Sequence, residues 1–398
     1  MRVGPLGALA RVWQGLRRGS ADSGRIRRVL QSCGREVRLG RNVRISHPKW
    51  ACLGHAVRIE DDARLETEGG LCVGHGARIG RGVVIRTRVR GSADPAGSRR
   101  PVLVGRGATI GAGARIEAGS AIGDGAAVAP GAVVDGAVAG GSYDADDGRG
   151  TAAGTRFVFV PSTGRSGTTT IARLLSAHPE IRCRHERRRQ LIRLSTELAH
   201  GVVDAGQAEA ELRAIYVASG VYRSPIYGDS DHRLFNLIAI LGRILPDARF
   251  VWLVRDGRDV VASTMARGWY DAEYTSGTWG DYRLRGDAAG EVEASEWNAM
   301  TPFAKNCWYW AHVNRVIGRE VERLPPDRWM PLRLEDLRRD ATDVFRFLDV
   351  DPVRAGEVRA NPSRRTVMPP AAWTDVERET FERWCGESMD RWYPGWRP

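Results

Sequence analysis

The chain has 398 residues, of which 42% are hydrophobic and 27% are charged. This composition is that of a globular protein and excludes a chain that is disordered throughout; the length exceeds one ordinary hydrophobic core, so we expect two domains. The net charge of +12 favours anionic partners such as nucleotides, phosphates, acidic glycans or a membrane surface. The sequence contains no nucleic-acid recognition motif, so nucleic acid is not expected as a partner.

The first segment, residues 1–34, is predicted to be helical. Its apolar residues Leu6, Leu9, Trp13 and Leu16 fall on one face of a helix. We expect this face to pack on the following domain, and peripheral contact with a membrane surface is the alternative. The six cysteines of the chain are scattered without a Cys-x-x-Cys pair, which favours a reduced cytoplasmic protein over a disulfide scaffold or a zinc site.

Residues 35–140 contain a six-residue repeat. An aliphatic residue recurs at this period at Leu53, Ile59 and Leu65, at Val73, Ile79 and Ile85, and at Val104, Ile110, Ile116, Ile122, Val128 and Val134. Such a period indicates a solenoid in which each repeat buries one aliphatic side chain. The pattern resembles the hexapeptide-repeat family. This resemblance implies a left-handed parallel β-helix that assembles as a homotrimer.

Many hexapeptide-repeat proteins are acyltransferases with a catalytic histidine in a loop between coils. The polar loop that breaks the period here, at about residues 91–100, contains no histidine. His47, His55 and His75 lie nearby, and the last two occupy a repeat position where a polar residue exposed at a turn is ordinary. We therefore interpret the β-helix as a scaffold and trimerisation module, with acyl transfer as the alternative.

A linker is predicted at residues 141–155, which are small, polar and acidic, and an α/β pattern follows over residues 156–398. This second domain opens with a predicted buried strand at Phe157–Val160, a turn rich in Gly, Ser and Thr, and a helix from Thr168 to His178. A strand, a glycine-bearing turn and a helix bind phosphate through backbone N–H groups and the helix N-terminus.

The turn differs from an ATP-binding loop. The Gly-Lys-Ser/Thr that such a loop needs is replaced by Gly167-Thr168-Thr169, and the cation comes earlier, at Arg165. A second anion site is predicted where Arg255 follows a strand and Ser263 lies in the next helix. Two phosphate sites on one sheet indicate a nucleotide that carries phosphates at two positions.

The two blocks "TGRSGTT" and "LVRDGRDVVAS" resemble the cofactor motifs of sulfotransferases that use 3′-phosphoadenosine 5′-phosphosulfate (PAPS). The stretch "LLSAHPEIRCRHERRR" is similar to tyrosylprotein sulfotransferases. This resemblance implies a P-loop-like α/β fold with a parallel sheet and sulfuryl transfer without a metal. It implies a 5′-phosphosulfate site at Arg165, Ser166, Gly167, Thr168 and Thr169, a 3′-phosphate site at Arg255 and Ser263, and a late cofactor loop at Arg364 and Arg365.

The resemblance also assigns catalytic roles. The general base of the family falls on Glu186, with His185 as a neighbouring candidate, and Arg165 faces the transferring group. Related enzymes have a lysine before the second motif. The matching stretch here, residues 227–236, has none, and His232 or Arg233 is the candidate for its role.

The acceptor site is predicted from the aromatic loop at residues 268–282, with Trp269, Tyr270 and Arg188 as candidate substrate contacts. We expect a carbohydrate or a glycosylated small molecule as acceptor. The leading hypothesis is therefore a sulfotransferase with a β-helix scaffold. A bifunctional acyltransferase-sulfotransferase acting on the same glycan and a non-catalytic binding or assembly protein are the alternatives.

Overall fold

The computed structural model describes residues 29–89, 99–139, 155–188, 190–218, 224–271, 282–339, 341–353 and 368–397. Residues 1–28 of the predicted N-terminal helical segment, most of the linker, and Arg364 and Arg365 lie outside these residues. The prediction is wrong at the end of that segment, where Ser32–Cys33 form a strand that pairs with the first sheet of the β-helix. The chain forms two compact units. Unit 1 is Met1–Gly154 with Ala210–Arg223, and unit 2 is Thr155–Glu209 with Ser224–Pro398.

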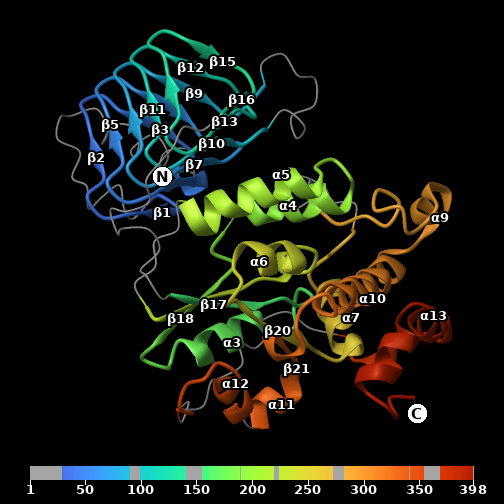
Figure 1. Cartoon of the computed structure of the whole chain (residues 1–398). Coiled ribbons are helices and arrows are strands. Elements are labelled where there is room, and N and C mark those ends of the chain that lie inside the picture. Colours follow the sequence, from blue (N-terminus) through green and yellow to red (C-terminus); the bar gives the residue numbers. More distant parts are fainter. Residues whose placement is uncertain are drawn as a thin grey trace, which may run out of the picture. The chain divides into compact units, whose positions relative to one another are not determined.

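Unit 1 is a stack of short parallel strands in three sheets (Figure 1). The first sheet contains β1 (Ser32–Cys33), β4 (Ala51–Leu53), β7 (Leu71–Val73), β10 (Val102–Val104), β13 (Ala121–Ile122) and β16 (Ala137–Val138). The second contains β2 (Arg38–Leu39), β5 (Arg58–Ile59), β8 (Arg78–Ile79), β11 (Thr109–Ile110) and β14 (Ala127–Val128). The third contains β3 (Arg44–Ser46), β6 (Arg64–Glu66), β9 (Val84–Arg86), β12 (Arg115–Ile116) and β15 (Val133–Val134). This architecture is the predicted parallel β-helix of the hexapeptide-repeat type.

The six-residue repeat places one aliphatic side chain per strand inside the stack. The repeat aliphatics form a single buried core, and only Val134, in the last strand of its sheet, is partly exposed. The small residues of the repeat are needed where coils approach each other. A Cβ added to Gly54 would lie 2.7 Å from the backbone nitrogen of His75 on the next coil. The period therefore sets both the core and the spacing of the coils.

His55 and His75 connect successive coils. Their rings stack with centroids 5.0 Å apart. The Nδ1 atom of His75 accepts a hydrogen bond from the backbone N–H of His55 (2.8 Å), and that of His55 accepts one from Arg35 (3.0 Å). The expectation of an exposed side chain is wrong for His75, which is only 5% exposed because the neighbouring coil covers it. These contacts support the scaffold interpretation.

Unit 2 contains a five-stranded parallel sheet in the order β18-β19-β17-β20-β21. The strands are β17 (Arg156–Val160), β18 (Ile181–His185), β19 (Ile226–Ser230), β20 (Arg249–Val254) and β21 (Trp329–Arg333). The predicted α/β fold with a parallel sheet is confirmed. Its helices are α3 (Thr168–Leu175), α4 (Gln190–Ala199), α6 (Ile238–Ile244), α7 (Gly257–Met265), α9 (Ala294–Ala299), α10 (Pro302–Val321), α11 (Leu334–Arg339), α12 (Thr342–Phe347) and α13 (Asp375–Trp392). Helix α5 (Ala205–Leu212) begins in unit 2 and ends in unit 1.

Helices cover both faces of this sheet (Figure 1). Helices α3, α11 and α12 share one hydrophobic core with the sheet. On the opposite face, α10 contacts β20, α6, α7 and α13, and Trp252 of β20 donates a hydrogen bond to Asn314 of α10 (3.2 Å). Among the helices that the structure describes, none is both long enough and apolar enough to cross a membrane.

Helix α3 ends at Leu175, before the predicted end at His178. The Ser176 hydroxyl donates to the Cys183 carbonyl (2.8 Å) and accepts from the Cys183 backbone N–H (3.0 Å). This pair of bonds turns the chain back into β18, so the residues before Pro179 form a turn instead of a further helical turn. Strand β18 then runs parallel to β17 and brings Glu186 to the end of the sheet where the loop lies.

Candidate active site

Several chain segments meet at the carboxyl edge of the sheet in unit 2. Val160 at the end of β17 pairs with Ser230 at the end of β19, and Ser230 pairs with His185 at the end of β18. Strand β20 pairs with β17 on its other side and is followed by Arg255. Because the carboxyl ends of parallel strands lie at one edge, the residues that follow these strands gather there.

The loop between β17 and α3 is held in place by hydrogen bonds within it and with α10. The backbone N–H of Gly164 donates to the Tyr309 hydroxyl oxygen (2.9 Å), and the hydroxyls of Thr163 and Ser166 form a buried hydrogen bond. Gly167, the N-cap of α3, has φ of 91°. A Cβ there would lie 2.5 Å from Leu334 Cδ1, so both the backbone angle and the close approach require glycine. The loop thus leads directly into a helix N-terminus, where anions bind.

The predicted anion-binding residues of the two motifs are neighbours. Arg165 donates from Nε to the Ser263 hydroxyl (3.1 Å), and Arg255 donates to the Arg165 carbonyl (3.0 Å). Arg255 also pairs with Asp259 at 2.8 Å. The pKa of Arg165 is lowered by burial and by the charges of Arg267 and Arg255. Positive charge is therefore concentrated at the loop beyond what the local acids neutralise, which is the condition for binding a multiply charged anion.

The threonines of the loop lie at the start of α3. Thr168 is buried, and its carbonyl accepts a hydrogen bond from the Ser230 hydroxyl (3.0 Å). Thr169 is partly exposed. The start of α3 and the side chains of Arg165 and Arg255 thus lie close together, where they provide N–H groups and cations for an anion.

Glu186 and His232 form a hydrogen-bonded pair beside this loop. The Nδ1 atom of His232 lies 3.0 Å from Glu186 Oε1, and Nε2 of His185 lies 3.9 Å from the same oxygen. Glu186 follows β18 directly and has φ of 45°, a left-handed conformation that costs a residue other than glycine of order 1–3 kcal/mol. Its backbone N–H donates to the Ser230 carbonyl (3.2 Å). The neighbouring strand thus holds Glu186 in a strained conformation that directs its carboxylate to His232.

The Glu186 carboxylate is held in its ionised form. Burial alone would raise its pKa, but the hydrogen bond from His232 and the charges of His232, Arg233 and His185 outweigh burial. Together they hold the pKa of Glu186 well below its usual range. A carboxylate with so low a pKa is a weak proton acceptor. It is well suited to accept a hydrogen bond from an imidazole and to stabilise the imidazolium.

His232 and Arg233 are the two candidates for the role of the missing lysine. Of these, His232 contacts Glu186 beside the loop. Arg233 is buried and holds both oxygens of Asp231, at 2.6 and 2.5 Å. Within the described part of the chain, Glu186, Asp231 and His232 are the residues whose spacing suits a metal ion. Both carboxylate oxygens of Asp231 already accept hydrogen bonds from Arg233, so these three side chains do not favour a metal.

Trp269 forms a wall of the site. A Cβ added to Gly164 would lie 2.5 Å from the Trp269 ring, which places the indole directly on the loop. The ring packs edge-on against Tyr309, with centroids 5.4 Å apart, and its centroid lies 4.1 Å from the Arg283 guanidinium carbon. The His232 ring lies 6.5 Å from it. A pocket next to this wall is lined by Ile192, Ser195, Thr196, His232, Arg233, Phe235, Tyr282, Arg283, Leu284 and Tyr309.

Two of the predicted substrate contacts instead stabilise the fold. The Tyr270 hydroxyl donates to the Leu284 carbonyl (2.7 Å), and its ring packs on Trp297. Arg188 is 3% exposed and lies 3.5 Å from Asp229. Burial therefore removes Arg188 from contact with an acceptor, and the Tyr270 hydroxyl is already bonded to the Leu284 carbonyl, which the sequence alone did not reveal. Trp269 remains the predicted contact at the site.

Sequence reasoning missed Tyr309, Arg267 and Arg283. Tyr309 comes from the long helix α10, 145 residues after the loop glycine that it contacts. Nothing in its local pattern distinguishes it from the other aromatic residues that pack this helix. Arg267 and Arg283 flank the aromatic loop, and their position beside the predicted Trp269 was the one available signal.

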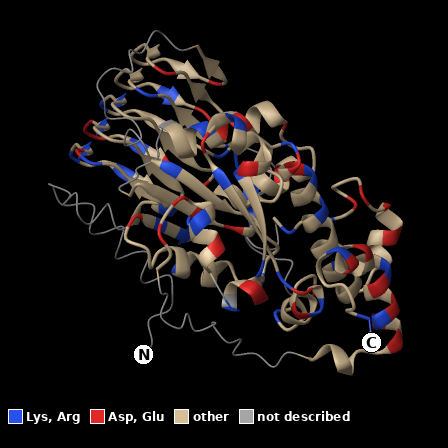
Figure 2. Ribbon diagram, turned by 60° about the horizontal axis from the view of Figure 1, so that its bottom comes forward, with Lys and Arg blue, Asp and Glu red and all other residues tan. Residues whose placement is uncertain are grey.

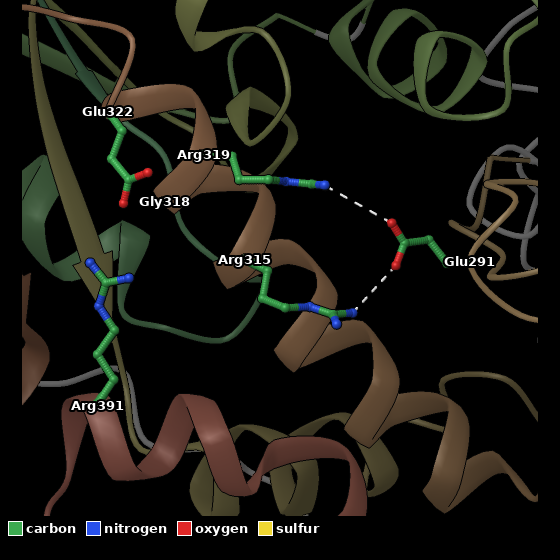
Figure 3. Close-up of a pocket in the computed structure, with 6 residues that line it drawn as sticks. All are labelled: Glu291, Arg315, Gly318, Arg319, Glu322 and Arg391. Atoms are coloured by element: carbon green, nitrogen blue, oxygen red, sulfur yellow. Dashed lines mark hydrogen bonds and ion pairs between the residues drawn. The ribbon is translucent and has the colours of Figure 1, made fainter.

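A second hollow lies on α10 and α13, with a volume of about 240 Å³. Figure 3 shows Glu291 between Arg315 and Arg319, at 3.4 and 3.9 Å, while Arg391 reaches in from α13 near Glu322. The two glutamates offset much of the arginine charge. This hollow therefore lacks the excess positive charge of the loop site.

Residues 158–349 match the model of the sulfotransferase family. The chain is similar to protein-tyrosine sulfotransferase 1 of Danio rerio, with 25% identity over 58% of this chain and 66% of the relative. It is 31% identical to protein-tyrosine sulfotransferase 1 of Homo sapiens over 28% of this chain and 34% of the relative. The chain thus spans 66% and 34% of the lengths of these two relatives.

Solved structures resemble each unit in turn. A sulfotransferase domain from the curacin biosynthetic pathway aligns with 58% of this chain and 90% of its own, at 16% identity and a TM-score of 0.32. A maltose O-acetyltransferase from Clostridium difficile 630 aligns with 34% of this chain and 77% of its own, at 19% identity and a TM-score of 0.31. The segment that matches the sulfotransferase family model contains the loop, Glu186, His232 and Arg255.

Proposed function

We propose that unit 2 transfers a sulfuryl group from PAPS to an acceptor hydroxyl. The observation that carries this proposal is the juxtaposition at one sheet edge of the Arg165–Arg255–Ser263 group with the Glu186–His232 pair. The first binds a doubly phosphorylated nucleotide, and the second accepts a proton beside it. The match to the sulfotransferase family model supports the same reaction.

The donor site consists of this chain's own cations and N–H groups. The loop backbone, Arg165 and the hydroxyls at the start of α3 would hold the 5′-phosphosulfate, and Arg255 with Ser263 would hold the 3′-phosphate. When bound, the donor supplies an electrophilic sulfur and a phosphate leaving group. The cation at Arg165 stabilises negative charge that develops between them, and it needs no reorganisation because Ser263 already fixes its guanidinium.

The Glu186–His232 pair accepts the proton of the acceptor hydroxyl. The resemblance to tyrosylprotein enzymes assigns the base to Glu186, but its lowered pKa makes the carboxylate a poor base. We assign proton acceptance to His232. In its neutral form His232 donates its Nδ1–H to Glu186, 3.0 Å away, so Nε2 is the nitrogen that accepts the proton. Glu186 sets this tautomer and stabilises the imidazolium that forms.

The acceptor binds through a ring, in the pocket beside His232. Tyr309, Phe235 and Leu284 line this pocket with apolar and aromatic surface, and Thr196 adds a polar group. The Trp269 ring lies next to it, packed against Tyr309. Aromatic walls with few polar groups bind sugar rings and phenols alike. We propose a carbohydrate or glycosylated small molecule. A phenolic hydroxyl is the second candidate, because the curated relatives are named as protein-tyrosine sulfotransferases.

The decisive test is transfer from radiolabelled PAPS to a panel of oligosaccharides, glycosylated small molecules and tyrosine peptides. Label transferred to a sugar hydroxyl supports the proposal, and label transferred only to tyrosine shifts the acceptor class. Calorimetry with 3′-phosphoadenosine 5′-phosphate tests the donor site separately. Failure of that ligand to bind more tightly than ATP would refute the assignment of the donor.

A further inference from the structure

One sheet of the β-helix carries a stripe of arginines on its outer face. Arg38 of β2 pairs in register with Arg58 of β5, and Arg58 pairs with Arg78 of β8. All three side chains are exposed, whereas the aliphatic residue that follows each points inward. The next positions along the sheet are Thr109 and Ala127, which are also exposed. Figure 2 shows Lys and Arg in blue, recurring on successive coils.

The register places these like charges next to one another. Adjacent strands of a sheet lie about 4.7–4.9 Å apart, and like charges directly opposite each other destabilise a sheet. The rigid stack prevents the three Cα atoms from separating to relieve the repulsion. This stripe therefore works against the stability of the β-helix in the absence of a counter-charge.

Several arginines at the turns of unit 1 pair with acids on adjacent coils. Arg41 pairs with Asp61 at 3.0 Å, and Arg81 pairs with Asp62 at 3.3 Å. Arg106 pairs with Asp124 at 2.8 Å. By contrast, no carboxylate within the described ranges lies within ion-pair distance of Arg38, Arg58 or Arg78. These three turn arginines thus have a counter-charge, and the three arginines of the stripe do not.

We propose that the arginine stripe (Arg38, Arg58 and Arg78) binds an acidic polysaccharide. A polysaccharide that carries carboxylates or sulfates on its sugar rings presents many anions along one extended chain. Guanidinium groups match both anions through two parallel hydrogen bonds. An extended chain lying across β2, β5 and β8 would meet one arginine at each coil, which offsets the repulsion between them.

The outer positions favour this partner over nucleic acid. Single strands bind on aromatic side chains that stack with the bases, and the positions in line with the stripe, Thr109 and Ala127, provide none. A duplex carries one charge per about 1.7 Å of its axis on two strands that wind around it, which one straight row of arginines does not match. Self-association through this face is opposed by its own charge. The stripe consists of unit 1 residues alone, so its binding is measurable whether or not the chain transfers sulfuryl groups.

The test uses the full chain and two triple variants of equal net charge. One variant carries Arg38→Gln, Arg58→Gln and Arg78→Gln. The matched control carries Arg323→Gln, Arg346→Gln and Arg378→Gln, which remove exposed arginines of unit 2 that each pair with an acid three residues earlier. Both variants lower the net charge from +12 by the same amount. The labelled probes are polygalacturonate, dextran sulfate, neutral dextran and oligothymidylate, and the affinity of each is measured by fluorescence anisotropy over a range of salt concentrations.

We expect the native chain to bind both acidic polysaccharides and not neutral dextran. The stripe variant should lose at least tenfold in affinity. The slope of its log K against log salt concentration should become less negative by about 2, because each of the three lost contacts with a flexible polyanion contributes about 0.7 to this slope. The control should stay within about twofold of the native chain. Equal losses in both variants would show that net charge alone governs binding. Tighter binding of oligothymidylate than of either polysaccharide, or binding of neither polysaccharide, would also overturn the proposal.

Thermal unfolding provides a second readout. Removing three mutually repelling charges should leave the Tm of the stripe variant equal to or above that of the native chain. A stripe variant that unfolds well below both the native chain and the control would show that these arginines stabilise the fold, and would refute the premise.

Discussion

Replacing His232 with Asn tests the assignment of the base. Asparagine keeps a side chain of similar reach but accepts no proton at neutral pH. Because a positioned general base contributes typically about 10²–10⁴ in rate, His232→Asn should lower kcat by that factor. Affinity for 3′-phosphoadenosine 5′-phosphate should hardly change, since the donor contacts lie at Arg165, Arg255 and Ser263.

Glu186→Gln should have a smaller effect than His232→Asn. The glutamine carbonyl still accepts the hydrogen bond that joins these two residues at 3.0 Å, so the tautomer of His232 is kept and only the charge is lost. A hydrogen bond to a charged group contributes about 1.5–3 kcal/mol and a neutral one about 0.5–1.5 kcal/mol. The difference, about 1–1.5 kcal/mol, corresponds to roughly a tenfold decrease in rate.

The assay is single-turnover transfer from labelled PAPS at saturating donor, with calorimetric titration of 3′-phosphoadenosine 5′-phosphate for each variant. His185→Asn is the control, because His185 lies 3.9 Å from Glu186 and contacts the Ser230 carbonyl. It should remain close to the native rate. A loss in Glu186→Gln as large as that in His232→Asn, or larger, would refute our reasoning and return the role of base to Glu186.

Further predictions concern the donor site, acid stability, the core and assembly. Arg255→Ala should weaken the binding of 3′-phosphoadenosine 5′-phosphate by about ten- to a hundredfold in calorimetry, because a charged hydrogen bond contributes about 1.5–3 kcal/mol. The binding of an analogue without the 3′-phosphate should change little. Equal losses for both ligands would show that Arg255 does not bind the 3′-phosphate. The lowered pKa of Glu186 stabilises the fold above the ordinary glutamate pKa of about 4.3, and this contribution is lost as the pH falls from there toward the lowered value. In denaturant titrations, the free energy of unfolding of Glu186→Gln should therefore fall less steeply with decreasing pH than that of the native chain. An equally steep fall in both proteins would contradict this prediction. Ile79→Ala in the β-helix core should cost about 2–5 kcal/mol in unfolding free energy, whereas Val133→Ala, at an exposed position, should cost far less. Light scattering of the full chain should give the mass of a trimer, and a monomer would end the trimerisation proposal.

The local patterns of the sequence determined the elements of both units. The six-residue period specified the β-helix because every coil repeats the same local requirement, one buried aliphatic side chain and small residues at the turns. The loop after β17 was equally readable, since a strand, a glycine turn and a helix are contiguous in the chain. In each case the physical cause acts over a few neighbouring residues.

Only the tertiary structure decided which side chains meet. Glu186 and His232 lie 46 residues apart, and Arg165 and Ser263 lie 98 apart. Their contacts depend on the strand order β18-β19-β17-β20, which no local pattern encodes. The same order buried Arg188 against Asp229, although the sequence predicted it as a substrate contact. Pairing between distant strands sets these distances, because the hydrogen bonds of the sheet, and not the chain between them, bring the strand ends together.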